Sequence, residues 1–274
     1  MRKIIAIILY YMGILIHKNR MRILSLYFHN PSPEAFERIV KWAIKKNYTF
    51  IDRKTFLDWV SGKRQLESKA VYFSFDDGWK GNMKLIPVIE KYNVPITIFI
   101  PVFPLSEGNY WWEYVLKEYG SYKKVNEVKT WCYDDFLAEI ERIKSYMKIE
   151  RSAMTMEELK AINKHPLIDI QSHSYTHLIL TKLPIEVLVK ELHNSKFYLE
   201  KLLEKKIDSF SYPNGSFTDR EITAVGKYYD YAFTTEQTYP VIGDSLLTIP
   251  RIAQTNDYWS NLAKIAGTWE WIKK

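Results

Sequence analysis

The sequence is poor in three features that define large classes of protein. It has one cysteine, Cys132, so it forms no internal disulfide, and a single thiol fits a reducing compartment. It has ten glycines and no glycine-rich phosphate-binding fingerprint after a predicted strand. Its N-terminal hydrophobic run, residues 4–16, spans about 20 Å as a helix, short of the ~30 Å hydrocarbon layer.

Positive charge is in excess but is not concentrated in one place. The 274 residues include 39 Lys and Arg against 32 Asp and Glu, a formal charge of +7. No block of Lys and Arg is long enough for a nucleic-acid-binding arm, so we expect no nucleic-acid partner. The composition, 47% hydrophobic and 26% charged, suits one large globular domain with a sizeable core.

Residues 1–20 form a separate apolar segment with basic ends. Arg2 and Lys3 precede the run 4–16, and Lys18 and Arg20 follow it. No small-x-small cleavage site follows, so we do not expect a cleaved signal peptide. The run predicts a helix that either docks on the domain or lies in a membrane surface, where basic flanks suit anionic lipid. We accordingly expect a cytoplasmic or membrane-associated protein.

From residue 21 to residue 274, predicted strands and helices alternate along the chain. Apolar runs predict strands at 23–28, 49–51, 70–75, 95–100, 167–172, 209–212 and 231–234. Helices are predicted at 32–47, 54–61, 82–92, 155–164, 185–204, after Thr218 and from 258 onward. Repeated strand–helix units predict a parallel α/β fold, and the absence of a phosphate fingerprint favours a distorted (β/α) barrel, like a TIM barrel, over a doubly wound sheet.

Residues 101–152 interrupt this alternation. The pattern loosens there, although a charged helix is predicted at 133–147. We interpret the segment as an insertion in a single barrel domain.

The first chemical signal lies in residues 70–78. Six apolar or small residues, typical of a strand buried on both faces, run into Asp76, Asp77 and Gly78. Two adjacent carboxylates beside a core are costly unless a cation or a proton compensates them. Taken alone, an ordinary Asp-Asp-Gly turn explains the pattern better.

The second signal is a pair of histidines. His173 and His177 lie four residues apart, directly after the predicted strand 167–172. Each alone is typical of a buried histidine bonded to a carbonyl group. Near an Asp-Asp turn, however, two imidazoles and one carboxylate form a three-ligand metal site with an open position for water.

Two more groups follow predicted strands. Residues 212–215, Tyr-Pro-Asn-Gly, predict a tight turn that leaves backbone N–H groups free, although a plain turn explains them equally well. His29 ends the strand 23–28. All four groups therefore fall at carboxyl ends of predicted strands, the face of a barrel where catalytic groups gather.

These residues resemble the motifs of a known family. Residues 74–78 (SFDDG), His173-Ser-x-x-His177 and 212–215 (YPNG) resemble the first three motifs of the polysaccharide deacetylases, the NodB-homology domain of carbohydrate esterase family four. The resemblance extends over about residues 23–252. Residues 26–29 (LYFH) and 249–252 (IPRI) further resemble the bacterial branch that acts on exopolysaccharide or cell-surface glycans.

The resemblance implies a distorted (β/α) barrel and a hydrolase that removes acetyl groups, usually from N-acetylglucosamine units. The bond cleaved would be an amide other than a peptide bond, in a polysaccharide, a surface glycan or its lipid-linked precursor. Asp77, His173 and His177 would hold a divalent metal, Zn²⁺ in the first place and Co²⁺, Ni²⁺ or Fe²⁺ as alternatives. Asp76 would be the general base.

The resemblance also implies the remaining roles. His29 would protonate the leaving amine, and a backbone N–H of Asn214 would help to stabilise the oxyanion. Many members carry an arginine before the third motif, where this chain has Ser209, so we expect Arg251 to orient the base instead. The family's fourth motif is not evident unless Asp230 serves.

A second function, from a different class, remains open at this point. The chain could be a catalytically weak domain that binds glycan through its aromatic side chains without turning it over. The sequence does not fix the oligomeric state.

Overall fold

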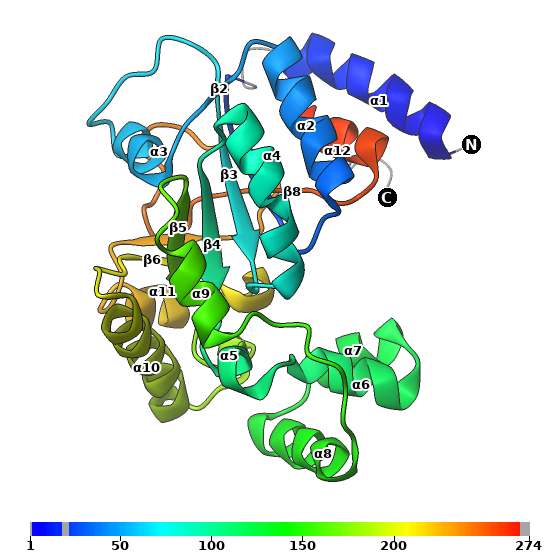
Figure 1. Ribbon diagram of the computed structural model, residues 1–274, viewed down its shortest axis with the longest axis vertical. Coiled ribbons are helices and arrows are strands. Elements are labelled where there is room, and N and C mark those ends of the chain that lie inside the picture. The colour runs from blue at the N-terminus through cyan, green and yellow to red at the C-terminus, as the bar shows by residue number, and fades with distance from the viewer. Residues whose placement is uncertain (1, 18–21, 269–274) are drawn as a thin grey trace.

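The computed structural model describes residues 2–17 and 22–268 and shows a curved parallel sheet surrounded by helices (Figure 1). The strands are β1 (Ile23–Phe28), β2 (Thr49–Phe50), β3 (Ala70–Asp76), β4 (Ile96–Ile100), β5 (Ile168–Ser172), β6 (Ser209–Ser211), β7 (Tyr231–Phe233) and β8 (Ile252–Ala253). Neighbouring strands pair in the order β7-β6-β5-β4-β3-β1-β8, and β2 pairs with the first residues of β3. Every strand pairing in this described sheet is parallel, as the sequence predicts.

One segment closes the sheet into a distorted barrel. Phe233 at the end of β7 forms a parallel bridge with Ile249, and Thr234 N donates to Ile249 O at 2.8 Å. The same segment continues into β8, whose Ile252 pairs with Leu26 of β1. The expected barrel is thus confirmed, with a short and irregular seam between β7 and β1.

Helices surround the barrel, and one of them, α3 (Arg53–Val60), packs its Phe56 against the interior face of β3. The others are α1 (Arg2–His17), α2 (Pro33–Lys45), α4 (Ile86–Tyr92), α9 (Met156–Ile162), α10 (Ile185–Leu203), α11 (Asp219–Val225) and α12 (Tyr258–Ile265). The helices predicted at 155–164 and after Thr218 are confirmed as α9 and α11, and Thr155 and Thr218 form capping boxes at their starts. The predicted helix 82–92 begins as the 3₁₀ helix η1 (Lys80–Leu85) and becomes α4 where Pro87 suits a first turn.

The insertion folds into four helices at one end of the molecule (Figure 1). These are α5 (Phe103–Glu107), α6 (Trp111–Tyr119), α7 (Tyr122–Val128) and α8 (Tyr133–Tyr146). The helix predicted at 133–147 is therefore confirmed as α8, whereas the three shorter helices and β8 were not predicted.

Side-chain alternation along β3 decides where its acidic end points. Val71, Phe73 and Phe75 belong to the main core between the strands and the outer helices. Tyr72 packs on the other face, stacked on Phe56 at 4.7 Å within a second buried cluster. Asp76 follows the same alternation as Tyr72, so its side chain enters the barrel interior.

Candidate metal centre and active site

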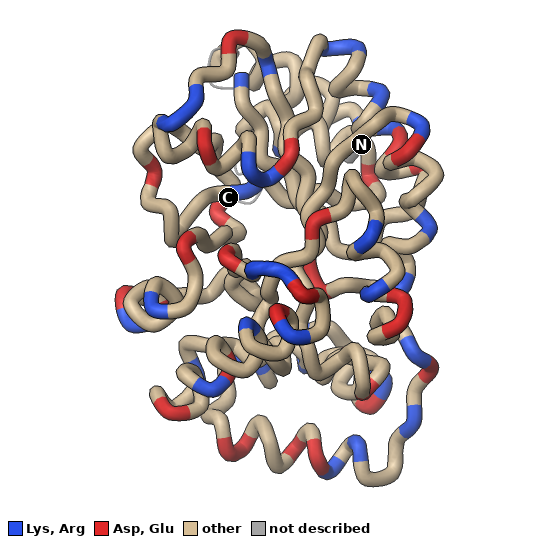
Figure 2. The backbone as a smooth tube through the Cα atoms, turned by 60° about the vertical axis from the view of Figure 1, so that its left-hand side comes forward, with Lys and Arg blue, Asp and Glu red and all other residues tan. Residues whose placement is uncertain are grey.

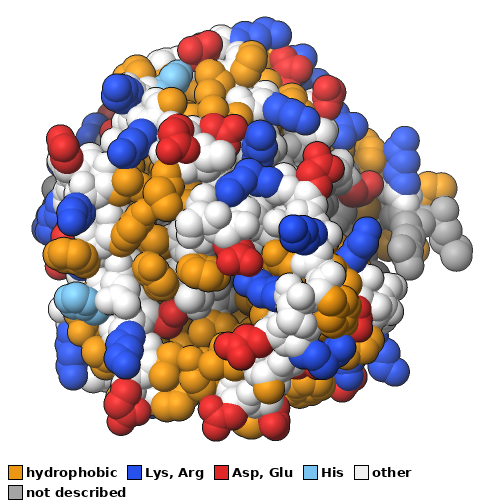
Figure 3. Space-filling model, turned by 60° about the horizontal axis from the view of Figure 1, so that its bottom comes forward, with side chains coloured by type: hydrophobic (Ala, Val, Ile, Leu, Met, Phe, Trp, Pro, Cys, Tyr) orange, Lys and Arg blue, Asp and Glu red, His pale blue; other side chains and the backbone are white. Residues whose placement is uncertain are grey.

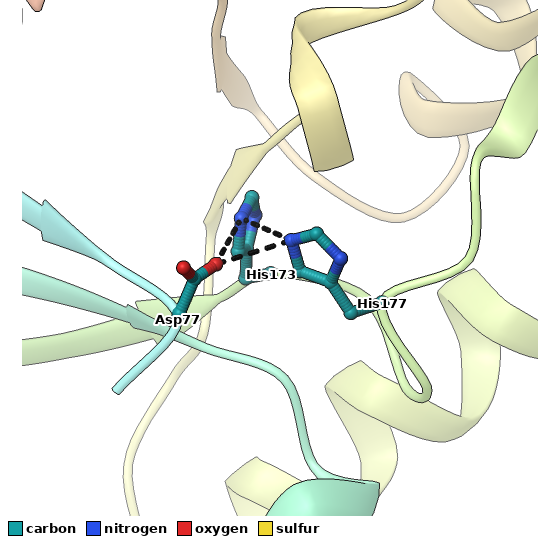
Figure 4. Close-up of side chains that lie close together, drawn as sticks. All are labelled: Asp77, His173 and His177. Carbon is teal, nitrogen blue, oxygen red and sulfur yellow. Dashed lines mark hydrogen bonds and ion pairs between the residues drawn. The ribbon is translucent and has the colours of Figure 1, made fainter. Parts of the chain in front are cut away.

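Three predicted ligands meet at the carboxyl end of the barrel (Figure 4). Asp77 follows β3, and His173 and His177 follow β5. The Asp77 Oδ1 atom lies 3.4 Å from His173 Nε2 and 3.1 Å from His177 Nε2. The two Nε2 atoms lie 3.1 Å apart, and all three side chains are buried. The predicted cluster is therefore formed.

Local backbone geometry aims these ligands at one another. Strands β3 and β5 both pair with β4, so their carboxyl ends lie close together. Asp77 has a φ of 75° and His177 a φ of 63°, left-handed conformations that are uncommon outside glycine. Ser174 Oγ accepts a hydrogen bond from His177 N at 3.0 Å and holds the turn. Such backbone strain is typical of residues fixed for a function.

The donor atoms fit a cation. His173 Nδ1 lies 2.7 Å from the Ser211 carbonyl, which only accepts, so Nδ1 carries a proton, and in the neutral form of His173 the Nε2 lone pair faces the cluster. Asp77 Oδ1 is buried without a hydrogen bond. The three converging atoms are Asp77 Oδ1 and the two Nε2 atoms. If both imidazoles are neutral, at most one hydrogen-bonding proton lies among these atoms, whereas one divalent ion can bind all three.

The charge states of Asp77 and His177 also suit ligation, whereas at His173 the carboxylates of Asp76 and Asp77 outweigh burial and raise the pKa. Burial alone would raise the pKa of Asp77, but contacts with His173 and His177 outweigh it and hold the pKa well below its ordinary range. Burial lowers the pKa of His177 and outweighs the opposing pull of the Asp77 carboxylate. An ionised carboxylate and a neutral imidazole are the forms that bind metal.

Asp76 lies beside the cluster and is held by Arg251. The Arg251 Nη1 and Nη2 atoms donate to Asp76 Oδ1 and Oδ2, each at 2.8 Å. Ser211 Oγ donates to the same carboxylate at 3.3 Å. Burial opposes ionisation of Asp76, but Arg251 outweighs it and holds the pKa of Asp76 below its ordinary value. The carboxylate is therefore ionised and fixed in orientation at neutral pH.

Arg251 is fully buried, and its other contacts offset the free-energy cost of burying its charge. Its guanidinium also donates to Ser74 Oγ at 3.1 Å, Ser211 Oγ at 2.7 Å and Thr234 O at 3.1 Å. The Tyr27 ring stacks on the guanidinium, with 4.4 Å between the ring centroid and Arg251 Cζ. A buried charge with a full set of acceptors, a paired carboxylate and an aromatic face avoids most of the penalty of burial.

Both acids and both histidines open into a cavity of about 530 Å³. The insertion forms one wall, which includes Trp111, Trp112, Tyr122, Val125, Asn126 and Lys129. Figure 3 turns this end of the molecule forward and shows hydrophobic side chains gathered around a hollow in the surface. The site is thus a concave, partly aromatic pocket with a few converging charged groups, as ligand sites commonly are.

His29 and Asn214 line the same cavity. The His29 side chain is exposed, and its backbone carbonyl accepts from Asn82 Nδ2 at 2.8 Å. Asn214 has a φ of 59°, and its side-chain oxygen accepts from Lys129 Nζ at 2.9 Å. The hydrogen bonds of this turn run from Gly215 N to Tyr212 O and from Ser216 N to Pro213 O, so they do not use the Asn214 N–H.

The suggestion that Asp230 replaces a missing motif is wrong. Asp230 directly precedes β7, so it lies at the amino end of a strand, whereas the metal ligands follow the carboxyl ends. Its carboxylate is exposed and pairs with Lys206 Nζ at 2.7 Å.

Sequence reasoning missed the residues that support the ligands. Trp79 Nε1 donates to Asp77 Oδ2 at 3.0 Å, and Tyr110 Oη donates to the Asp77 carbonyl at 2.8 Å. Trp111 Nε1 donates to the His177 carbonyl at 3.0 Å. Trp79 follows Gly78 directly, which is a weak signal, but nothing in the sequence pairs the insertion with the ligand loops.

Comparison with known proteins identifies this arrangement. The family model of polysaccharide deacetylases matches residues 63–233, which contain both acids and both histidines. The chain belongs to the polysaccharide deacetylase family. The family, the barrel fold and the hydrolase class expected from the sequence are thereby confirmed.

Curated relatives of this polysaccharide deacetylase cover most of its length. The poly-beta-1,6-N-acetyl-D-glucosamine N-deacetylase of Staphylococcus aureus (strain MRSA252) is 24% identical over 239 residues, which are 86% of this chain and 71% of the relative. The protein of the same name from Staphylococcus epidermidis is 23% identical over 238 residues, 86% of this chain and 72% of the relative.

Solved structures support the fold of the deacetylase. IcaB from Ammonifex degensii superposes with a TM-score of 0.66 at 18% identity, covering 89% of this chain and 96% of that one. Streptococcus pyogenes deacetylase PplD, in complex with acetate, gives a TM-score of 0.64 at 19% identity, with 89% and 96% coverage.

Proposed function

We propose that the chain removes N-acetyl groups from N-acetylglucosamine units of a β-1,6-linked or related cell-surface glycan. The observation that carries the proposal is the shared cavity, in which the Asp76–Arg251 pair adjoins the Asp77, His173 and His177 cluster. The names of the curated relatives support the substrate class. A polymeric glycan, a surface glycan and a lipid-linked precursor present the same acetamido group.

The donor set favours Zn²⁺ as the resident ion. Two imidazoles and one carboxylate, with an open position, are typical of catalytic zinc sites, and Co²⁺, Ni²⁺ or Fe²⁺ accept the same donors. Such an ion, when bound, lowers the pKa of a water to about 7 and polarises a carbonyl group. The orientation of the His173 ring fits this assignment. Its Nδ1 is held by the Ser211 carbonyl, as is usual for a metal-binding histidine, and its Nε2 faces the cluster.

Asp76 supplies the base. Its carboxylate is ionised, lines the cavity and is fixed by two hydrogen bonds from Arg251. It takes a proton from the attacking water as the new carbon–oxygen bond forms to the acetyl carbon. Arg251 stays charged throughout, so its role is to position Asp76 rather than to transfer a proton.

The second proton goes to the leaving nitrogen. When the carbon–nitrogen bond breaks, the sugar amine needs a proton, and His29 lines the cavity as the donor. The Asn214 N–H is available to the oxyanion, since the hydrogen bonds of its turn do not use it. The products are acetate and a free amine on the sugar, so atoms and protons balance.

Acetate release tests the proposal. We expect release from poly-β-1,6-N-acetylglucosamine, weaker release from chitin oligomers, loss of both with chelator, and recovery on adding Zn²⁺. Asp76→Asn serves as the matched inactive control. Release that ignores chelator contradicts the metal mechanism. Glycan binding without any release supports the alternative, a non-catalytic binding domain, which the convergence of both acids, both histidines and Arg251 does not favour.

A further inference from the structure

Helix α1 packs one face against the domain and leaves most of its large apolar side chains exposed on the other. Ala6, Tyr10 and Gly13 are buried against the domain. Seven of the sixteen large apolar side chains exposed among the described residues lie on this helix, namely Ile4, Ile5, Ile8, Tyr11, Met12, Leu15 and Ile16. Leu15 is 80% exposed. Helices that serve only to cover a core place their apolar stripe the other way round.

The inner face of α1 packs tightly on the rest of the domain, so the helix cannot rotate to bury its outer face. A Cβ atom on Gly13 would lie 2.4 Å from the Ala266 carbonyl oxygen, which shows how closely α1 approaches the end of α12. Tyr10 Oη accepts a buried hydrogen bond from Trp42 Nε1 of α2 at 3.0 Å. Thr268 Oγ1 donates to the Leu9 carbonyl at 3.0 Å.

The stretch of sequence that contains α1 carries charge of one sign. Residues 1–33 contain five basic residues, Arg2, Lys3, Lys18, Arg20 and Arg22, and no aspartate or glutamate. Further along the chain, basic and acidic residues are interspersed, as Figure 2 shows. Basic residues that flank an apolar helix in the sequence complement an anionic surface.

We propose that α1 docks in the surface of an anionic lipid bilayer, with its outer face at the boundary between headgroups and acyl chains. The helix has 16 residues, and no helix in the described part of the chain has the length and hydrophobicity needed to span a bilayer. An apolar face with basic flanks on such a helix is the pattern of interfacial binding. A second copy of the chain is a less suitable partner for this face, because the basic segments of the two copies would lie close together and repel each other.

The docking has a consequence that rests on the proposed function. Figure 1 places α1 and the insertion, which walls the active-site cavity, at opposite ends of the molecule. Docked enzyme therefore presents its cavity away from the lipid. It acts on glycan that extends from the membrane surface, and lipid binding leaves the cavity open.

Vesicle sedimentation of the full chain tests the docking without reference to activity. The probe is phosphatidylcholine vesicles with about 30% phosphatidylglycerol, against vesicles of phosphatidylcholine alone. The test variant is Ile8→Ser/Leu15→Ser, and the matched control is Ile185→Ser/Phe197→Ser, which removes two exposed apolar side chains from α10. We expect the α1 variant to lose roughly tenfold or more in affinity and the control to bind as the wild type does.

A second variant keeps the test sharp if the first is poorly folded. Neutralising Arg2 and Lys3 to glutamine leaves the apolar face intact and should weaken binding about fivefold for each charge at low salt, with little effect at high salt. Wild-type protein that does not sediment with anionic vesicles, or an α1 variant that sediments as the wild type does, overturns the proposal. So does a wild-type dimer in ultracentrifugation that the α1 variant abolishes, since a second copy would then cover the face.

Acetate release by vesicle-bound enzyme tests the predicted orientation of the docked protein. We expect it to release acetate from a soluble oligomer as fast as free enzyme does. Inhibition of bound enzyme would contradict the orientation. Absence of release by both forms would contradict the proposed function and leave the docking result standing.

Discussion

Arg251 meets both carboxylate oxygens of Asp76 at 2.8 Å, although 175 positions separate the two residues in the chain. The segment that closes the barrel between β7 and β8 carries Arg251 into the interior, next to Ser74 and Ser211. The segment that closes the barrel therefore also supplies the residue that orients the proposed base.

Replacing Arg251 should affect stability and turnover separately. In Arg251→Met the buried Asp76 carboxylate loses its partner, which we expect to reduce the free energy of unfolding by about 3–5 kcal/mol. In Arg251→Lys the charge remains but the two-pronged contact is lost, so turnover should fall at least about tenfold while bound metal is kept. Urea unfolding, metal analysis and acetate release measure the three quantities.

A double variant provides the control for this pair. Arg251→Met/Asp76→Asn removes both charges, so it should recover part of the stability lost in Arg251→Met without recovering turnover. A double variant as unstable as the single one would show that Asp76 and Arg251 do not act as a pair.

Trp79 should tune the metal site from outside it. Its indole N–H holds Asp77 Oδ2 at 3.0 Å, and loss of such a contact commonly lowers metal affinity about 10–100-fold. We expect this loss in Trp79→Phe by competition with a chelator. Trp59→Phe, at a buried tryptophan outside the cavity, is the matched control, and equal affinities in the two variants would contradict the prediction.

Replacement of His29 should reduce activity most on substrates with poor leaving groups. An ionised base and a protonated acid together give a bell-shaped pH dependence of kcat/KM. In His29→Ala the alkaline limb should change, and amide substrates should lose far more activity than activated esters, whose leaving groups need no proton. Equal losses on both substrates would remove His29 from the mechanism.

The opposite end of the barrel carries a pH-dependent ion-pair network. Arg53 donates to Asp169 and Asp208, each at 2.5 Å, and Lys205 donates to Asp169 at 2.9 Å. Burial alone would raise the pKa of Asp169, but Arg53 and Lys205 outweigh it and lower the pKa. The network's contribution is therefore fully present above about pH 4 and is lost as pH falls through the lowered folded pKa.

Asp169→Asn tests that sign. Because a third of this side chain is exposed, we expect a loss of only about 1 kcal/mol in the free energy of unfolding at neutral pH. The difference from wild type should shrink below about pH 4. Asp230→Asn, which breaks an exposed pair with Lys206, should change stability by less than about 0.5 kcal/mol. A difference that grows in acid would refute the account.

The metal ligands could be predicted because they follow the ends of strands within a few residues. Asp77 directly follows β3, and His173 directly follows β5, so strand positions alone place them at one end of a parallel barrel. The interior direction of Asp76 likewise follows from side-chain alternation. The same reasoning failed for Asp230, because that residue precedes its strand and therefore lies at the other end.

Contacts that depend on closure or on short helices could not be derived in the same way. β8 has two residues and α5 has five, too few to produce a periodic signal. Arg251 was expected to orient the base only from family resemblance, since nothing local aims it at Asp76. The contact of Trp111 with the His177 loop requires the packing of the insertion on the barrel, which local patterns do not determine.

Metal content and turnover in the two adjacent acid variants test the central claim most directly. Asp76→Asn should keep one divalent ion per chain and lose about 10²–10⁴-fold in acetate release, because only the base is removed. Asp77→Asn, like His173→Ala and His177→Ala, should lose the ion itself. Equal metal content in Asp76→Asn and Asp77→Asn, or normal turnover in Asp76→Asn, would contradict the division of roles at this site.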